Sequence, residues 1–390
     1  MRILVLATKP PTLRNGDALR FVHVARHLQG EHRFELLCYA RPGQELDSES
    51  RAVFEKVTCL PFPSQARRSI LARALSAFSV SHFMPHDEAM GRAVATTIAR
   101  ERCDLVFDLG GLMLANLQPR EISPPVVVDS VDEPAITYGR ALRHASLLQK
   151  PRLLRTRWLY EQVNRAIHAR VAANVYASEL DADHYAQEFP GARVATIPNG
   201  VDTEFFRPRP GGAEPGLVAF EGNLAFEPNV DAARVLCQEI LPRVWSERAG
   251  TRAILVGRDP TDEVRAFASP RVEVTGTVAD VRESLWRAEV FACPMRLGAG
   301  IKNKVLQAWA LGLPVVATRQ ALGGLAALDG QNVLVRDEPG SFAQALCTLL
   351  DDRGLRERLS TNGRALVLER YTWRAQAERF GALFAEVTGA

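Results

Sequence analysis

The sequence predicts an α/β protein of two doubly wound domains that face each other across a cleft. Three observations indicate this fold class. Short β-branched runs alternate with longer helical stretches along the whole chain. A length of 390 residues is too great for one ordinary core. A stretch rich in Pro and Gly near the middle divides the chain into halves of similar size. Ligands of such folds bind where the strands end, so we expect functional residues just after strands.

In the first half, runs of apolar and β-branched residues predict seven strands: Arg2–Ala7, Phe34–Tyr39, Val57–Leu60, Asp104–Phe107, Val126–Asp129, Val171–Tyr176 and Val194–Ile197. Helical periodicity fills the gaps between them. Between Ala18 and Leu28, for example, apolar residues recur at helical spacing. The alternation of strands and helices predicts a parallel sheet that is buried on both faces.

The second half repeats the pattern with six predicted strands: Leu217–Glu221, Ala253–Val256, Val272–Thr275, Val290–Cys293, Val315–Ala317 and Val333–Val335. Helices are predicted at about 229–248, 261–268, 280–287, 302–311 and 340–350, followed by Trp373–Val387. Between the halves, a turn at Pro198–Asp202 precedes the segment Arg207–Gly212, whose prolines and glycines exclude a helix or strand.

Composition narrows the class of protein. The sequence is 47% hydrophobic and 24% charged, as in soluble globular proteins. No apolar run approaches the ~18 residues of a membrane-spanning helix. The run Ile3–Ala7 is too short for the core of a signal peptide. A net charge of +3 gives no indication of a nucleic-acid partner. We therefore expect a cytoplasmic protein.

Cysteine and histidine spacing argues against metal binding. The six cysteines contain no C-x-x-C pair, which predicts reduced and mostly buried thiols and neither a disulfide framework nor a zinc site. His82 and His86 are four residues apart, but Pro85 lies between them and no third ligand is near in the sequence. We expect no metal.

The strongest local motif follows the strand Val290–Cys293. A Gly-rich loop, Pro294–Ile301, leads into a helix that starts near Lys302. Cations such as Lys302 and Lys304 are unfavourable at a helix N-terminus unless a polyanion binds there. The motif therefore indicates a phosphate site, although its spacing is not that of a Walker loop. The alternative is an ordinary loop with two solvated lysines.

The run from Gly300 to Ala317 resembles the donor-binding segment of retaining glycosyltransferases of family 4, which have the GT-B fold of two Rossmann-like domains. Four further segments resemble, in order, that family's interdomain hinge, the opening of its second domain and the next two strand-end loops: Ile197–Pro208, Phe220–Ala232, Leu255–Pro260 and Val272–Val278. The sequence is most similar to the branch associated with exopolysaccharide and exosortase systems.

The resemblance implies a transferase that uses a nucleotide-diphosphate sugar and needs no metal or other cofactor. It implies an acceptor-binding domain over residues 1–205 and a donor-binding domain over 213–371, with a C-terminal helix, 372–390, crossing back to the first domain. The implied donor-binding residues are Gly16, Gly222, Asn223, Val278, Gly300, Ile301, Lys302, Asn303, Lys304 and Gln307. The family's usual Arg in the first loop of the second domain is not found, because Asn223 occupies that region, and Arg258 or Arg296 could substitute for it. Lys302 and Lys304 would meet the diphosphate, and the base would lie near Val278.

One departure from the family pattern bears on activity. The family usually has two glutamates eight positions apart, the second of which holds the donor ribose, whereas this sequence has Ala299 and Gln307. An amide oxygen still accepts a hydrogen bond from a ribose hydroxyl but lacks the charge that strengthens it. A non-catalytic or weakly active nucleotide-sugar-binding protein therefore stays open as an alternative.

Three acidic residues follow the buried strand at Val126: Asp129, Asp132 and Glu133. We expect Asp129 to accept a backbone N–H and Glu133 to face solvent, which leaves Asp132 for the cleft. Retaining members of the resembled family use front-face attack, in which the donor phosphate takes the acceptor proton and a carboxylate orients the acceptor. Asp132, and after it Asp129, are the candidates for that role. The alternative is that these acids cap the following helix.

Residues 140–170 contain eight basic side chains and a single acidic one, Glu161, interleaved with leucines and Trp158. A basic helix with Leu and Trp on one face suits an anionic membrane surface. The same segment could instead close the core of the first domain with solvated arginines. The expected partners are thus a nucleotide sugar and a saccharide or lipid-linked acceptor, with peripheral contact at the inner membrane face if this segment binds lipid.

Overall fold

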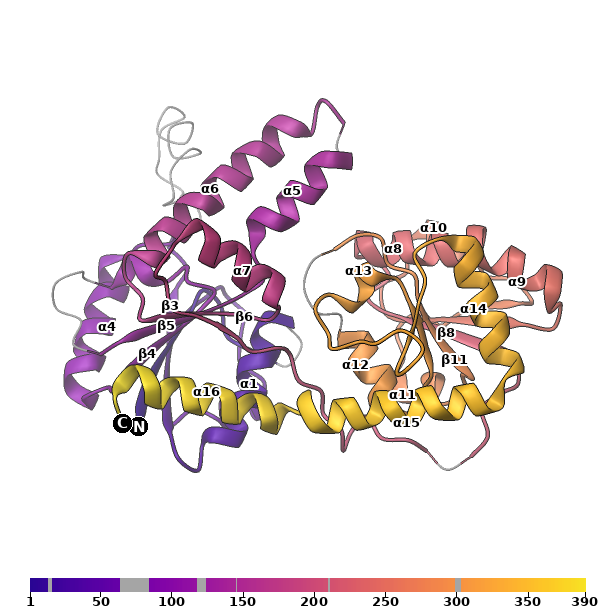
Figure 1. Cartoon of the computed structure of the whole chain (residues 1–390). Helices are drawn as coiled ribbons and strands as arrows, with labels where there is room; N and C mark the ends of the chain where they lie inside the picture. The colour runs from indigo at the N-terminus through magenta and orange to yellow at the C-terminus, as the bar shows by residue number, and fades with distance from the viewer. Residues whose placement is uncertain (13–15, 64–83, 118–123, 145, 210, 299–302) are drawn as a thin grey trace. The chain divides into compact units, whose positions relative to one another are not determined.

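The computed structural model describes residues 1–12, 16–63, 84–117, 124–144, 146–209, 211–298 and 303–390. The chain divides into two compact units (Figure 1). Unit 1 comprises Met1–Pro198 together with Gln376–Ala390, and unit 2 comprises Asn199–Ala375. Each unit has its own parallel sheet with helices packed against it.

Unit 1 contains a seven-stranded parallel sheet in the order β3-β2-β1-β4-β5-β6-β7. Its strands are β1 (Arg2–Ala7), β2 (Arg33–Ala40), β3 (Lys56–Pro61), β4 (Leu105–Leu109), β5 (Val126–Val131), β6 (Ala173–Tyr176) and β7 (Val194–Thr196). The central strands are buried along nearly their whole length, because helices cover both faces of the sheet.

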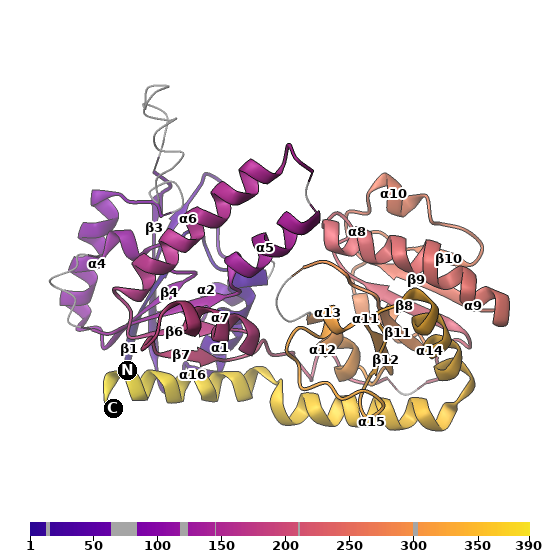
Figure 2. The same cartoon turned by 45° about the horizontal axis from the view of Figure 1, so that its top comes forward.

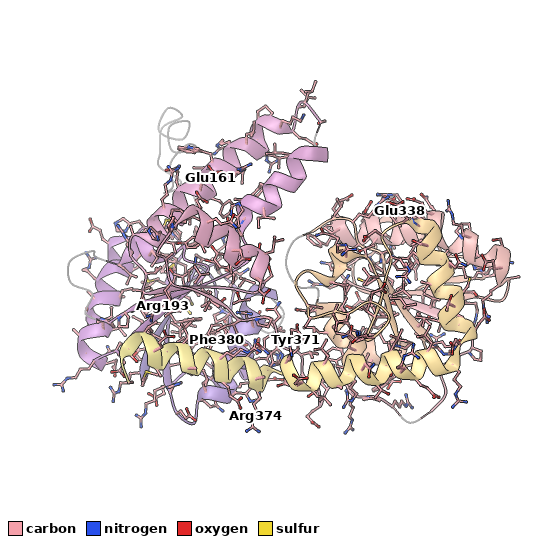
Figure 3. All side chains as sticks on the ribbon, viewed as in Figure 1. Glu161, Arg193, Glu338, Tyr371, Arg374 and Phe380 are labelled. Carbon is pink, nitrogen blue, oxygen red and sulfur yellow. The ribbon has the colours of Figure 1, made fainter. Side chains whose placement is uncertain are left out.

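The described helices of unit 1 are α1 (Gly16–Leu28), α2 (Ser48–Arg51), α4 (Glu88–Glu101), the 3₁₀ turn η2 (Leu114–Asn116), α5 (Pro134–His144), α6 (Lys150–His168), α7 (Glu179–Glu188) and most of α16 (Trp373–Thr388). Helices α5 and α6 lie side by side and project from the sheet in both views (Figures 1 and 2). Helix α16 packs Phe380, labelled in Figure 3, against Phe107 of β4, with 5.8 Å between the ring centroids.

Unit 2 contains a six-stranded parallel sheet in the order β10-β9-β8-β11-β12-β13. Its strands are β8 (Leu217–Glu221), β9 (Arg252–Val256), β10 (Val272–Val274), β11 (Val290–Cys293), β12 (Val315–Ala317) and β13 (Leu334–Val335). Its helices are α8 (Glu227–Arg234), the π-helical segment η3 (Val235–Ile240), α9 (Leu241–Glu247), α10 (Asp262–Arg265), α11 (Val281–Leu285), α12 (Asn303–Ala310), α13 (Arg319–Leu322), α14 (Pro339–Asp351) and α15 (Arg353–Arg370).

The predicted fold class, two doubly wound α/β domains, is confirmed. Each predicted strand forms, and β1, β8, β11 and β12 keep their predicted bounds. The sequence did not reveal α15. Its buried row is Leu359, Gly363 and Val367, and a glycine in that row weakens the apolar periodicity by which helices are predicted.

The boundary between the units lies at Pro198, whereas the sequence placed the end of the first domain at 205. Residues 199–205 belong to unit 2, and the start of this segment is bound to other residues of that unit. The Val201 N–H donates to the Tyr371 carbonyl at 2.8 Å, and Asn199 Nδ2 donates to Asn303 Oδ1 at 3.0 Å. Gly200 packs so closely on Trp373 that a Cβ there would lie 2.6 Å from the indole ring.

All six cysteines are free thiols, but two of them meet. Cys38 and Cys59 are register partners on the parallel strands β2 and β3, and their sulfurs are 3.4 Å apart. The sequence could not predict this contact, because the two cysteines lie on different strands and only the strand register brings them together. Among the described residues, no three His, Cys, Asp or Glu side chains gather as a metal site, and no helix is long and apolar enough to cross a membrane.

Replacing Gly363 by Ala should destabilise unit 2 by about 1–3 kcal/mol, the usual cost of overpacking a core. A Cβ at this position of α15 would lie 2.4 Å from Cδ1 of the fully buried Trp309, whose Nε1 is bound to the Asn332 carbonyl at 3.0 Å. Urea unfolding measures the change.

Gly340→Ala is the matched control for that substitution, because the Cβ site at Gly340 of α14 is open. It should leave the stability unchanged or raise it by up to about 1 kcal/mol through helix propensity. Equal stability of both variants would contradict the packing of α15 on Trp309.

Candidate functional site

A cavity of about 450 Å³ lies at the carboxyl edge of the unit 1 sheet. Its walls come from the ends of β1, β4 and β5 and from the inner face of α6. The lining residues are Ala7, Thr8, Lys9, Leu109, Gly110, Leu112, Asp129, Ser130, Val131, Asp132, Pro134, Tyr160, Val163, Asn164 and Ile167. The strand ends supply most of its polar groups, and α6 adds the apolar side chains of Val163 and Ile167, as is typical of a ligand site in a doubly wound fold.

The end of β5 carries a backbone distortion at this cavity. Val131 has φ of +65°, which is a true outlier for a β-branched residue, and the pairing of β5 with β6 shifts between Asp129 and Val131. A hydrogen bond of 2.7 Å from the Ala177 N–H to the Val131 carbonyl holds the distorted residue. Such strain is concentrated at functional sites, because the surrounding structure must hold it in place.

Asp129 forms a buried ion pair with Arg20 of α1. Arg20 Nε and Asp129 Oδ2 are 2.9 Å apart, and each side chain is 2% exposed. The Arg20 guanidinium also lies over the ring of Phe380 on α16, 5.1 Å from its centroid. The sequence had suggested a backbone N–H as the partner of Asp129, whereas the structure shows the Arg20 guanidinium bound to its carboxylate. Asp132, further along the cavity wall, is only half-buried.

Glu133 is buried, so the expectation that it faces solvent is wrong. Asn164 Nδ2 of α6 donates to both of its carboxylate oxygens at 3.0 Å, and the Tyr176 hydroxyl of β6 donates at 3.0 Å. The carboxylate also accepts the Ala135 N–H in the first turn of α5, as the capping alternative predicted. Burial raises the pKa of Glu133. No pattern in the sequence indicated Asn164 or Tyr176 as partners of Glu133, because they come from other elements.

Asp108, at the end of β4, is a second buried carboxyl that the sequence did not single out. Its Oδ2 accepts the Met113 N–H at 3.0 Å and so holds the loop that lines the cavity with Gly110 and Leu112. Burial raises the pKa of Asp108 to about 8. A carboxyl with this pKa is largely protonated at neutral pH.

In unit 2, Lys304 of α12 points into a cluster at the carboxyl ends of the strands. It is 9% exposed, its Nζ donates to Asn229 Oδ1 at 2.6 Å, and it lies 4.5 Å from the centroid of the Phe220 ring. Burial lowers the pKa of Lys304 and raises the pKa of the neighbouring Glu221, while the charge of each partly offsets the effect of burial on the other. Contact between Lys304 and a diphosphate stays a prediction.

Two glycines allow this cluster to pack. A Cβ on Gly222 would lie 2.7 Å from both Lys304 Nζ and Asn229 Nδ2. Gly257, with φ of +153°, lies so close to the Gly222 carbonyl that a side chain there would collide with it. The backbones after β8 and β9 therefore approach each other only because both positions are glycine.

The other predicted donor residues of unit 2 are spread around this cluster. The Asn223 carbonyl accepts from Asn229 Nδ2 at 2.9 Å. Arg258 is exposed, 3.8 Å from Asp259. Val278 is partly buried against the core, and Gln307 is half-buried on α12.

Arg296 is bound within unit 2 by two acids, Asp231 at 2.8 Å and Glu239 at 3.3 Å. Asn303 is held by Asn199. Gly16 is the first residue of α1 in unit 1. Gly300, Ile301 and Lys302 lie outside the described residues, as does Ala299.

Solved structures with the same architecture identify the fold. The sucrose-phosphate synthase of Thermosynechococcus elongatus has a TM-score of 0.71 at 15% identity, with all of both chains covered. Anabaena HepE, solved in complex with UDP, has a TM-score of 0.66 at 14% identity over 99% of this chain and 100% of its own. The fold is that of the GT-B glycosyltransferases.

Sequence comparisons identify the activity. Residues 215–352 match the family model of the glycosyl transferases group 1. The MMP alpha-(1->4)-mannosyltransferase of Mycolicibacterium hassiacum is 24% identical over 98% of each chain. Most of unit 2 thus matches the model of the glycosyl transferases group 1, and the protein is a transferase enzyme, a glycosyltransferase.

The two aspartates of the cavity should respond differently to loss of charge. Asp129→Asn removes the ion pair with the buried Arg20 and should lower the free energy of unfolding by about 3–5 kcal/mol. Asp132→Asn should change it by less than about 0.5 kcal/mol and slow sugar transfer about 100-fold through a misplaced acceptor. Thermal unfolding and single-turnover assays measure these effects. A stable Asp129→Asn protein that lacks activity would indicate that Asp129, and not Asp132, positions the acceptor.

Asp108 should make unit 1 less stable as the pH rises. The folded state binds its proton up to about pH 8, whereas an unfolded Asp releases it near pH 3.9. The folded state thus holds more protons between these values, and stability falls with a slope of at most about 1.4 kcal/mol per pH unit. Urea unfolding should show that Asp108→Asn reduces this slope, with Glu133 keeping a part of it, while Glu88→Gln, at an exposed carboxyl on α4, leaves it unchanged. Equal slopes in both variants would exclude a protonated Asp108.

Proposed function

We propose that the protein is a retaining glycosyltransferase that moves a sugar from a nucleotide-diphosphate sugar to an acceptor hydroxyl. The acceptor would be a saccharide or a lipid-linked molecule of polysaccharide or glycolipid assembly in the cytoplasm. One observation carries the proposal: the cluster of Gly222, Asn229 and Lys304 lies at the strand ends of the domain that matches the glycosyl transferases group 1. HepE, which has the same fold, was solved with UDP.

The donor would bind unit 2. The start of α12 offers N–H groups and a positive dipole end to a diphosphate, and Lys304 of the same helix would supply a charge. The close approach of Gly222 and Gly257 leaves backbone, and no side chain, at the ends of β8 and β9. The amide of Gln307 would accept a ribose hydroxyl, and the base would lie near Val278. These groups need no metal, because N–H dipoles and lysine charge offset the phosphate charge.

The acceptor would occupy the cavity of unit 1, where Asp132 orients its hydroxyl. In front-face transfer with retention, the acceptor oxygen forms a bond to the anomeric carbon as the bond to the donor phosphate breaks. The leaving phosphate oxygen takes the acceptor proton. Asp132 would therefore position the acceptor and would not act as a general base. The Arg20–Asp129 pair and the Glu133 network would keep the cavity wall in place.

Gln307 favours a second candidate, a nucleotide-sugar-binding protein without transfer. An amide at the ribose position forms a weaker hydrogen bond than a carboxylate does, and weaker donor binding would lower the rate at limiting donor.

A panel of uridine, guanosine and adenosine diphosphate sugars tests both candidates by calorimetry and by release of the nucleoside diphosphate. One donor should bind and lose its sugar in the presence of acceptor, with the anomeric configuration retained in the product by NMR. Binding without transfer would favour the second candidate, and binding of none would refute both. Gln307→Glu should tighten the donor by up to about tenfold, since charge-assisted hydrogen bonds are stronger. Gln331→Glu, at an exposed site, should not.

A further inference from the structure

Four large apolar side chains are exposed within one short stretch of unit 1, Ser146–Trp158, which we call the hairpin tip. It joins α5 to α6 and includes the first two turns of α6. The exposed fractions are 83% for Leu147, 93% for Leu148, 54% for Leu154 and 44% for Trp158. Single exposed leucines are common, but such a group in one projecting segment is typical of an interaction surface (Figures 1 and 2).

The charged residues in this part of the sequence are all basic. From Pro134 to Tyr160 the sequence contains no Asp or Glu. Lys150 and Arg152 are exposed within the hairpin tip. The first acid along α6 is Glu161, labelled in Figure 3, and it is bound to Arg157 at 2.9 Å. A surface that combines exposed leucines and a tryptophan with exposed basic side chains is complementary to an anionic bilayer, whose headgroups attract the cations while its acyl boundary takes up the apolar side chains.

The hairpin tip is continuous with the cavity wall through α6. Tyr160, Val163, Asn164 and Ile167 of this helix line the cavity, and Trp158 is exposed only two residues before Tyr160. Asn164 also binds Glu133, so a polar contact at the base of α5 holds the inner part of the helix in place. Helix α6 thus connects the two, with about 15 Å of helix between Lys150 at its start and Tyr160 in the cavity wall.

We propose that the hairpin tip binds the surface of an anionic bilayer and that the acceptor of the cavity is carried on a lipid in that bilayer. The second part rests on the proposed glycosyl transfer, and the first does not. Binding is peripheral and reversible, because leucines and a tryptophan at the acyl boundary add to a charge attraction that salt weakens.

Sedimentation with vesicles tests the surface directly, without any sugar transfer. The chain should sediment with vesicles of phosphatidylglycerol and phosphatidylcholine and not with phosphatidylcholine alone. Raising the salt from about 0.01 to about 1 M, which shortens the Debye length from about 30 to about 3 Å, should release it. No binding to the anionic vesicles at low salt would overturn the proposal.

Matched variants locate the contact. Leu147→Ser with Leu148→Ser should weaken vesicle binding about tenfold through lost apolar burial, and Lys150→Gln with Arg152→Gln should weaken it by a similar factor at low salt. Leu328→Ser with Leu368→Ser, and Arg319→Gln with Arg353→Gln, are controls at exposed sites of unit 2 and should bind as the parent does. Circular dichroism checks that each variant folds. A larger loss in the controls than in the hairpin-tip variants would overturn the proposal.

The oligomeric state and the transfer rate distinguish bilayer binding from self-association of the chain and from a soluble acceptor. If the leucines join two copies of the chain, the parent will sediment as a dimer without vesicles and the leucine variant as a monomer, which would contradict the bilayer contact. Transfer to a water-soluble acceptor should be equal in the parent and the leucine variant, whereas transfer to a vesicle-borne acceptor should fall about tenfold with binding. Vesicle binding without any transfer would count against the proposed function and leave the membrane surface standing.

Discussion

The burial of both sheets on both faces is the constraint on which the rest of the structure depends. The start of β5 and the whole of β11 have no solvated face, so the side chains there are apolar. Polar chemistry is then confined to the strand ends, where the chain leaves the sheet. Because parallel strands all end at the same edge, Asp108, Asp129 and Glu133 gather at one edge of unit 1. Lys304 lies at the corresponding edge of unit 2.

Asp129, Glu133 and Lys304 each have a partner supplied by another element. Asp129 pairs with Arg20, Glu133 accepts from Asn164 and Tyr176, and Lys304 donates to Asn229. A buried charge without such partners would cost several kcal/mol, so these contacts also fix how α1, α6 and α12 sit against their sheets. The strained Val131 is tolerated in the same way, because the backbone of the neighbouring β6 end holds its carbonyl. The side chains that hold the fold in place are thus also those that shape the candidate site.

Helix α6 has two functions in this arrangement. Its inner face closes the cavity of unit 1 and receives the Glu133 carboxylate through Asn164. Its first turns leave Leu154 and Trp158 exposed beside basic residues. The core alternative for segment 140–170 is therefore correct for the second half of the helix, whereas the hairpin tip keeps the amphipathic surface that the composition indicated.

The sequence by itself determined the order of the strands, most of the helices and the two-domain α/β class. Those features depend on local periodicity, on glycine and proline and on the rule that parallel strands end together. Only the tertiary structure decided which polar side chains meet. Arg20 and Asp129 are over a hundred residues apart in the chain, Cys38 and Cys59 meet through strand register, and Glu133 turned inward because Asn164 and Tyr176 lie beside it. Periodicity shows which face of an element is buried, but the partner of a buried charge depends on which elements pack together, and no local pattern carries that information.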